Sequence, residues 1–99
     1  MKEVKYATMD MLETLVDKAE KAEKNQYPDM HKINNTINEL DMDFETVRFP
    51  VVMSLDHNEI EARAVFSIPN PDGTMGQFLL DMEYEDFNKL PSKKLSEPS

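Results

Sequence analysis

The sequence predicts an α+β fold in which two N-terminal helices pack on a three-stranded antiparallel meander. Over residues 8–40 apolar residues recur every three or four positions, which is the period of an amphipathic helix. From residue 46 onward apolar and polar residues alternate, as in a strand with one buried face. Turn-forming residues separate the alternating stretches, and short turns join neighbouring strands in an antiparallel sheet.

The first predicted helix covers residues 8–25. Its apolar stripe consists of Met9, Leu12, Leu15, Val16, Ala19 and Ala22. Thr8 is the expected N-cap, and three lysines in the last turns suit the negative end of the helix dipole. Because Pro28 disfavours a helical backbone at Tyr27, the helix should end before these two residues.

The second predicted helix begins after Asp29, which is its expected N-cap, and runs to about Leu40. Its apolar stripe consists of Met30, Ile33, Ile37 and Leu40. The opposite side of this helix is polar. Both helices therefore have one apolar face that a sheet can cover.

Three strands are predicted after the helices. The first, over residues 47–55, contains Pro50, which has no N–H group, so this strand is expected at a sheet edge. The second covers residues 59–68, and the third covers residues 77–85 after a type I turn at residues 70–73. One face of the meander should pack on the helices, and the other should face water.

By its length the chain forms one domain over residues 1–90. Residues 91–99 contain mainly Ser, Lys and Pro and are predicted to form a disordered, flexible tail. The absence of Cys excludes a disulfide framework. No apolar run reaches the roughly 20 residues of a membrane helix, and the N-terminal residues lack a signal-peptide pattern. We therefore expect a cytoplasmic protein without a membrane partner.

The formal net charge of −9 originates in one part of the chain. Residues 39–86 contain twelve acids and two arginines, whereas every lysine lies outside this stretch. A protein this acidic repels nucleic acid, so direct binding to DNA or RNA is not expected. Its charge instead favours a basic protein as the partner.

Several of these acids occupy the polar positions of the predicted strands. Five of them should point away from the helices, namely Glu59, Glu61, Asp81, Glu83 and Glu85. Residues two apart in a strand are separated by roughly 6.5–7 Å, and neighbouring strands by about 4.8 Å. This array could imitate DNA, which presents one charge per roughly 3.4 Å along each strand. The candidate partner-binding residues are these five together with Asp41, Asp43 and Glu45.

In its small size, lack of Cys and concentration of acids over residues 39–86, the chain resembles the DNA-mimic proteins of lytic phages. Within that group it is most similar to inhibitors of the bacterial nucleoid protein HU. The resemblance implies a non-enzymatic inhibitor that binds a basic DNA-binding host protein without a cofactor, in the host cytoplasm.

Other functions remain open at this stage. The acids could serve only as a solubility coat, or the chain could be an antitoxin or adaptor that uses an apolar groove or a sheet edge. The third predicted strand lacks proline, so its edge could also pair with a second copy, although its acids oppose this.

A small metal-dependent enzyme is a further alternative, with ligands drawn from Asp56, His57, Glu59 and Glu61. An EF-hand is excluded, because a loop that begins at Asp41 would have Thr46 where Gly is needed and Val52 where Glu is needed. The chain also lacks a nucleophile elbow and a phosphate-binding loop. We therefore assign no catalytic or metal-binding residue.

Overall fold

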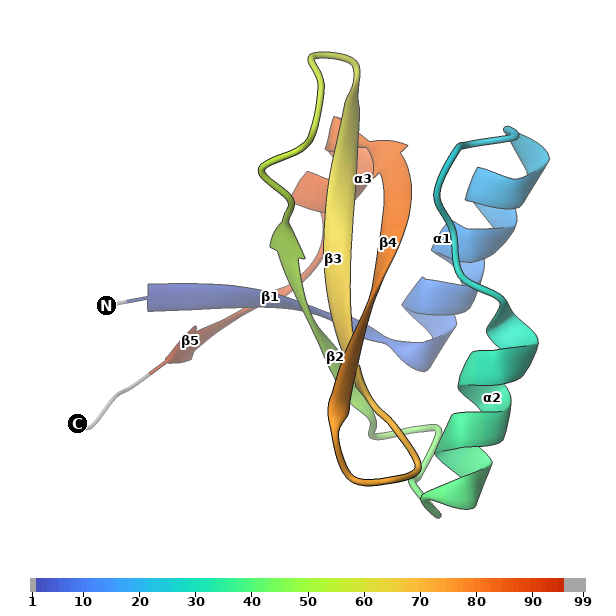
Figure 1. The fold of residues 1–99 in the computed structure, drawn as a ribbon. Coiled ribbons are helices and arrows are strands. Elements are labelled where there is room, and N and C mark those ends of the chain that lie inside the picture. The colour runs from blue at the N-terminus through green and yellow to red at the C-terminus, as the bar shows by residue number, and fades with distance from the viewer. Residues whose placement is uncertain (1, 96–99) are drawn as a thin grey trace.

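The computed structural model describes the backbone of residues 2–95 and the side chains of residues 4–92 (Figure 1). In chain order the elements are β1 (Lys2–Thr8), α1 (Met9–Lys21), α2 (Met30–Glu39), β2 (Arg48–Met53), β3 (Glu61–Pro69), β4 (Met75–Glu83), α3 (Tyr84–Asn88) and β5 (Ser92–Leu95). The predicted α+β class with an antiparallel sheet is confirmed.

Both predicted N-terminal helices are present, and each begins at its predicted cap. The Thr8 hydroxyl accepts a hydrogen bond from the Met11 N–H at 3.3 Å, and the Asp29 carboxylate accepts one from the His31 N–H at 2.9 Å. These side chains satisfy backbone donors that have no partner within the helix. Helix α1 ends at Lys21, four residues before its predicted end.

The sheet has five strands in the order β4-β3-β2-β1-β5, so the prediction of a three-stranded sheet is wrong. Strands β2, β3 and β4 form the predicted meander. Strands β1 and β5 were not predicted, and they pair with each other in antiparallel orientation at one side of β2.

The prediction of a flexible tail over residues 91–99 is wrong for β5, Ser92–Leu95. The backbone pairs Lys5 with Ser92 and continues along β1 from there. Residues 96–99 lie outside the part of the chain that the structure describes.

Pro50 does not lie in an edge strand, because β2 lies between β1 and β3. The Ser54 N–H donates a hydrogen bond to the Arg63 carbonyl at 2.7 Å, so the backbone N–H and C=O groups of the even-numbered residues of β2 point towards β3. The nitrogen of Pro50 therefore also faces β3, but the pairing of these two strands begins only at Val51. Proline is tolerated inside the sheet because it lies at the end of one ladder.

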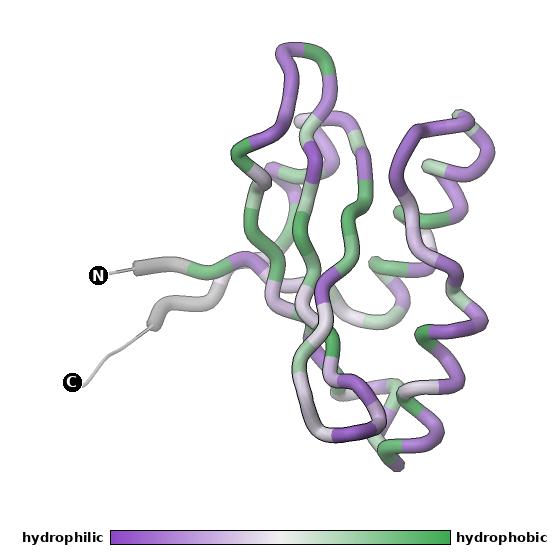
Figure 2. Tube along the Cα trace, viewed as in Figure 1, coloured by the Kyte–Doolittle hydropathy of each residue, from purple (hydrophilic) through white to green (hydrophobic). Residues whose placement is uncertain are grey.

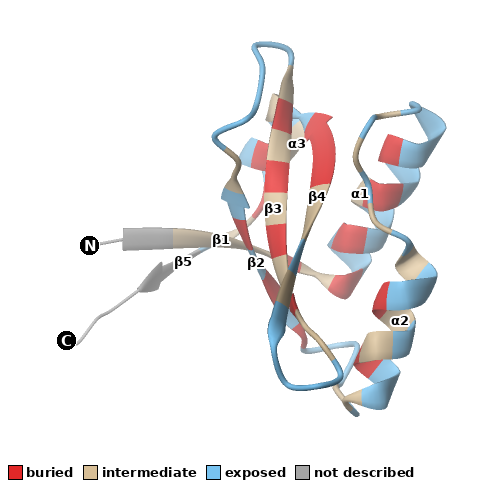
Figure 3. Cartoon of the chain, in the orientation of Figure 1, coloured by how far each residue is buried: buried red, intermediate tan, exposed pale blue. Residues whose placement is uncertain are grey.

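All three helices contribute to one hydrophobic core on the same face of the sheet. Leu12, Ile37 and Phe87, from α1, α2 and α3, are buried in a single cluster with strand residues such as Phe66 and Leu80. Strand β3 alternates between buried and half-buried residues along its whole length (Figure 3). The molecule therefore has two layers, with α1 and α2 to the right of the strands in Figure 1.

The β3–β4 hairpin turns where the sequence predicts. The Gly73 N–H donates to the Asn70 carbonyl at 3.0 Å, and Gly73 has φ of 92°, which suits glycine. At its other end β4 stops at Glu83, and helix α3 follows. Glu85 is therefore in a helix, and its predicted place in the third strand is wrong.

The core assignment predicts a large difference between two leucines. Replacing the fully buried Leu80 with Ala should lower the free energy of unfolding by about 2–5 kcal/mol, because it removes apolar contacts and leaves a cavity. The same replacement at Leu55, which is fully exposed in the loop after β2, should change it by less than about 0.5 kcal/mol. Urea denaturation of both variants measures the difference, and equal losses would contradict the assignment.

Candidate binding surface on the open face of the sheet

Within the described part of the chain no helix lies on one face of the sheet, and we call this face the open face. It consists of the even-numbered residues of β2, the odd-numbered residues of β3 and β4, and Tyr6 and Thr8 of β1. The assignment follows from the alternation of side chains along each strand, since their neighbours such as Ala7, Phe49 and Ala64 are buried beneath the helices.

The centre of the open face is apolar. Val52, Val65 and Leu79 are direct cross-strand partners, and together they form an apolar row across β2, β3 and β4. Val52 remains 56% exposed, and the other two are half-buried. Tyr6 and Pro50, which are paired with each other, extend this apolar area towards β1.

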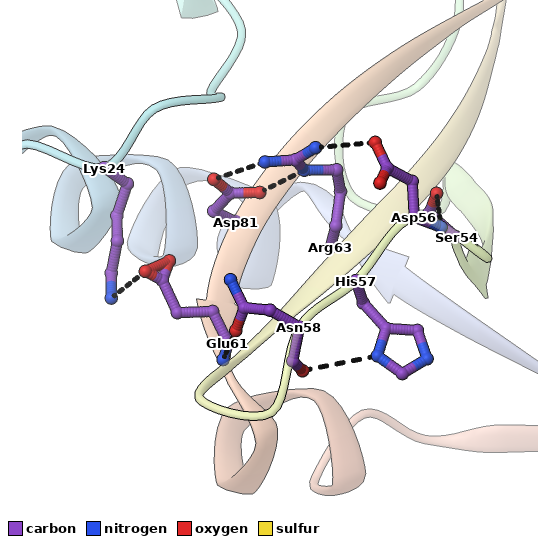
Figure 4. Close-up of polar contacts among 8 residues, drawn as sticks. All are labelled: Lys24, Ser54, Asp56, His57, Asn58, Glu61, Arg63 and Asp81. Atoms are coloured by element: carbon purple, nitrogen blue, oxygen red, sulfur yellow. Dashed lines mark hydrogen bonds and ion pairs between the residues drawn. The ribbon is translucent and has the colours of Figure 1, made fainter.

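An ion-pair network covers one end of the open face (Figure 4). Arg63 of β3 binds its cross-strand partner Asp81 through Nε–Oδ1 at 2.8 Å and donates a second, longer hydrogen bond to Oδ2 at 3.4 Å. Arg63 also contacts Asp56, in the β2–β3 loop, at 3.2 Å. The hydrogen bonds with Asp81 raise the pKa of Arg63 above its already high ordinary value, so the guanidinium stays charged.

A second cation lies beside this network. The Lys24 amine, in the linker between α1 and α2, is 3.2 Å from Glu83 and 3.5 Å from Glu61. These two glutamates are direct cross-strand partners. Burial lowers the pKa of Lys24, but its hydrogen bond with Glu83 and the two negative charges outweigh that effect and raise it. Lys24 therefore neutralises part of the repulsion between the two carboxylates.

The predicted array of five outward-facing carboxylates does not form. Asp81 is only 3% exposed and is paired with Arg63, so its prediction as a surface residue is wrong. Glu61 and Glu83 share Lys24, and Glu85, in α3, lies 3.8 Å from Lys89. Glu59 is exposed in the β2–β3 loop and not in a strand.

The other three predicted residues lie at the opposite end of the sheet. Asp41, Asp43 and Glu45 are exposed in the connection between α2 and β2, which precedes the first residue of β2. The Asp43 carboxylate accepts a hydrogen bond from the Glu45 N–H at 2.9 Å, which orders the connection. In the part of the chain that the structure describes, none of these three carboxylates forms an ion pair.

The β2–β3 loop has a defined structure. The Asn58 side chain accepts hydrogen bonds from the N–H groups of Ile60 and Glu61, both at 2.7 Å, and the Tyr84 hydroxyl contacts His57 Nδ1 at 2.7 Å and the Asn58 carbonyl. Leu55 and Ile60 are exposed in this loop, which contains hydrophobic segments in Figure 2. Among the described residues no three His, Asp or Glu side chains are placed to hold a metal ion.

The apolar row was not predicted, although its three residues are visible in the sequence. Val52, Val65 and Leu79 occupy positions in their strands where polar residues were expected. An apolar residue at such a position is common in a single strand. Only the register of the three strands shows that these residues are adjacent, and the alternation within each single strand does not reveal that register.

The shared cation gives a testable prediction. Replacing Lys24 with Met should lower the free energy of unfolding by about 1 kcal/mol, because Glu61 and Glu83 would then face each other without a countercharge. Sodium chloride should restore part of the loss by screening. Lys21, in an exposed i,i+4 pair with Asp17, is the matched control, and its replacement with Met should have a much smaller effect. Equal losses in thermal denaturation would contradict this role of Lys24.

Comparisons with known proteins returned no match to a family model, to a curated protein or to a solved structure. Within the described residues, no helix combines the length and apolar character required to cross a membrane. Function is therefore inferred from the charges, exposed side chains and contacts of the chain itself.

Proposed function

We propose that the chain is a non-enzymatic binding protein that inhibits a basic DNA-binding protein, such as the nucleoid protein HU, by presenting carboxylates in place of DNA phosphates. The observation that carries the proposal is a group of exposed acids at and after the end of α2, namely Glu39, the last residue of that helix, and Asp41, Asp43 and Glu45 in the α2–β2 connection. No ion pair with a described residue neutralises any of them.

The order of this connection supports the proposal. The Asp43 carbonyl accepts hydrogen bonds from the N–H groups of Thr46 and Val47, at 3.2 and 3.0 Å, in addition to the bond that its side chain makes. A charged surface that is already ordered loses little conformational entropy on binding. Carboxylates on such an ordered backbone are suited to a partner whose own site is arranged for phosphates.

A second group of acids supports the same function from the other end of the sheet. Glu59 is exposed in the β2–β3 loop, and Glu85 is exposed at the start of α3, where its one ion pair with a described residue is a long, exposed pair to Lys89. Exposed pairs of this kind are weak. The field of both groups, in a chain of net charge −9, attracts a basic protein before contact.

The proposal predicts that binding depends on the α2–β2 connection. A variant with Glu39→Gln, Asp41→Asn, Asp43→Asn and Glu45→Gln should keep the fold and bind HU at least tenfold more weakly, because four exposed charges are removed. The matched control removes four exposed charges from α1 and the residue after its C-cap, with Asp10→Asn, Glu13→Gln, Glu20→Gln and Glu23→Gln. Its loss of affinity should be clearly smaller.

The measurement is a calorimetric titration against HU at roughly 50 and 200 mM salt, with and without duplex DNA. Affinity should fall at the higher salt concentration, and DNA should compete with the chain. Absence of binding by the unaltered chain would refute the HU assignment. Binding without competition would refute mimicry, and equal affinities of both variants would exclude the connection as the contact surface.

A further inference from the structure

We propose that the open face is the interface of a homodimer, in which the apolar rows of two copies pack against each other around a two-fold axis. This inference does not depend on the proposed function. It starts from the open face, which no helix of the described chain covers and which has Val52, Val65 and Leu79 at its centre. Apolar groups that share such a face are typical of an interaction surface.

The charge on the open face suits a second copy of an acidic chain. The chain as a whole carries −9, and two copies would repel each other if that charge lay at the contact. Among the side chains that the structure describes, the charged groups that make ion-pair or cation–π contacts on or beside the open face are Lys24, Arg48, Arg63, Asp56, Glu61, Asp81 and Glu83. Three cations thus stand against four carboxylates, so this face is nearly neutral and most of the net charge lies elsewhere.

The charged groups of the open face also differ between its two ends. Arg48 precedes Val52 by four residues in β2, and Glu61 precedes Val65 by four residues in the antiparallel strand β3. The two groups therefore lie on opposite sides of the apolar row, each roughly 13 Å from it. Arg48 is fixed on this face, since its guanidinium lies over the Tyr6 ring at 5.6 Å and donates to the Thr46 carbonyl at 3.0 Å.

A two-fold axis along the apolar row makes this pattern self-complementary. The rotation places the row of one copy on the row of the other and exchanges the two ends of the sheet. Arg48 of each copy then faces the end that holds Asp56 and Glu61 in the other copy. Two sheets that pack face to face lie about 10 Å apart, which is close enough for their side chains to interdigitate.

Pairing along the edge of β4 is a less suitable route to a dimer. The Asp81 N–H points away from β3 and already donates to the Gln26 carbonyl at 2.9 Å. The linker between α1 and α2 therefore occupies the C-terminal part of that edge. A second strand could add there only by displacing the linker, whereas the open face needs no such rearrangement.

Sedimentation equilibrium of the full chain, from about 1 µM to about 1 mM, tests the proposal over the range of weak dimers. The unaltered chain should approach twice the mass of one chain as its concentration rises. Replacing Val52 with Glu should abolish the association, because it places a carboxylate in each copy at the centre of the contact. Val52 is 56% exposed, so the fold should survive, and circular dichroism checks this.

Met11→Glu provides the matched control. Met11 is 37% exposed on α1, in the other layer of the molecule, and the variant gains the same charge without losing the dimer. A charge exchange gives a second readout that does not depend on the apolar row. Arg48→Glu should weaken the dimer several-fold, and adding Asp56→Arg should restore it, because the two ends face each other across the axis.

A chain that stays monomeric over the whole concentration range overturns the proposal. The partner of the open face would then be a different protein chain. A dimer that survives Val52→Glu but not Met11→Glu also overturns it, since the contact would then lie on the helical layer. Failure of Asp56→Arg to restore association by the Arg48→Glu chain would refute the two-fold arrangement.

Discussion

The contact between Arg63 and Asp81 holds together the end of the sheet on which several other segments depend. Asp81 joins β4 to β3 through the guanidinium of Arg63, and its backbone N–H binds the α1–α2 linker at Gln26. Arg63 in turn binds Asp56, in the β2–β3 loop. Two strands, a loop and a linker therefore meet at one ion pair. Loss of Arg63 would leave the buried carboxylate of Asp81 without its countercharge, which is costly.

This contact also shows that the acids of the chain do not all serve the same purpose. Residues 39–86 are rich in acids, but a count does not distinguish a carboxylate that holds the fold from one that faces a partner. Asp81, Glu61 and Glu83 contact cations that come from other strands or from the linker. The carboxylates of the α2–β2 connection are exposed in a loop. Their different environments are the physical basis for separating a structural group from a surface group.

The features that the sequence predicted well are local. The caps Thr8 and Asp29 and the turn at Gly73 depend on contacts within a few residues, so their signals were readable. Strand β1 was missed because Lys5 occupies a core-facing position and breaks the alternation. The Lys5 amine donates a hydrogen bond to the Leu90 carbonyl at 3.1 Å, and Leu90 is far from Lys5 in the sequence. The partner of Asp81 and the alignment of the apolar row are likewise non-local.

The pairing of β1 with β5 has a consequence for how the chain folds. Lys5 and Ser92 lie side by side in the sheet although almost the whole described chain separates them. The ribosome releases β1 early and β5 late. The backbone groups of β1 that pair with β5 therefore have no partner strand until β5 has emerged. Contacts between distant residues slow folding, because closing the long loop between them costs conformational entropy before the stabilising contact forms. During synthesis β1 can therefore pair with β2 well before the last strand completes the sheet.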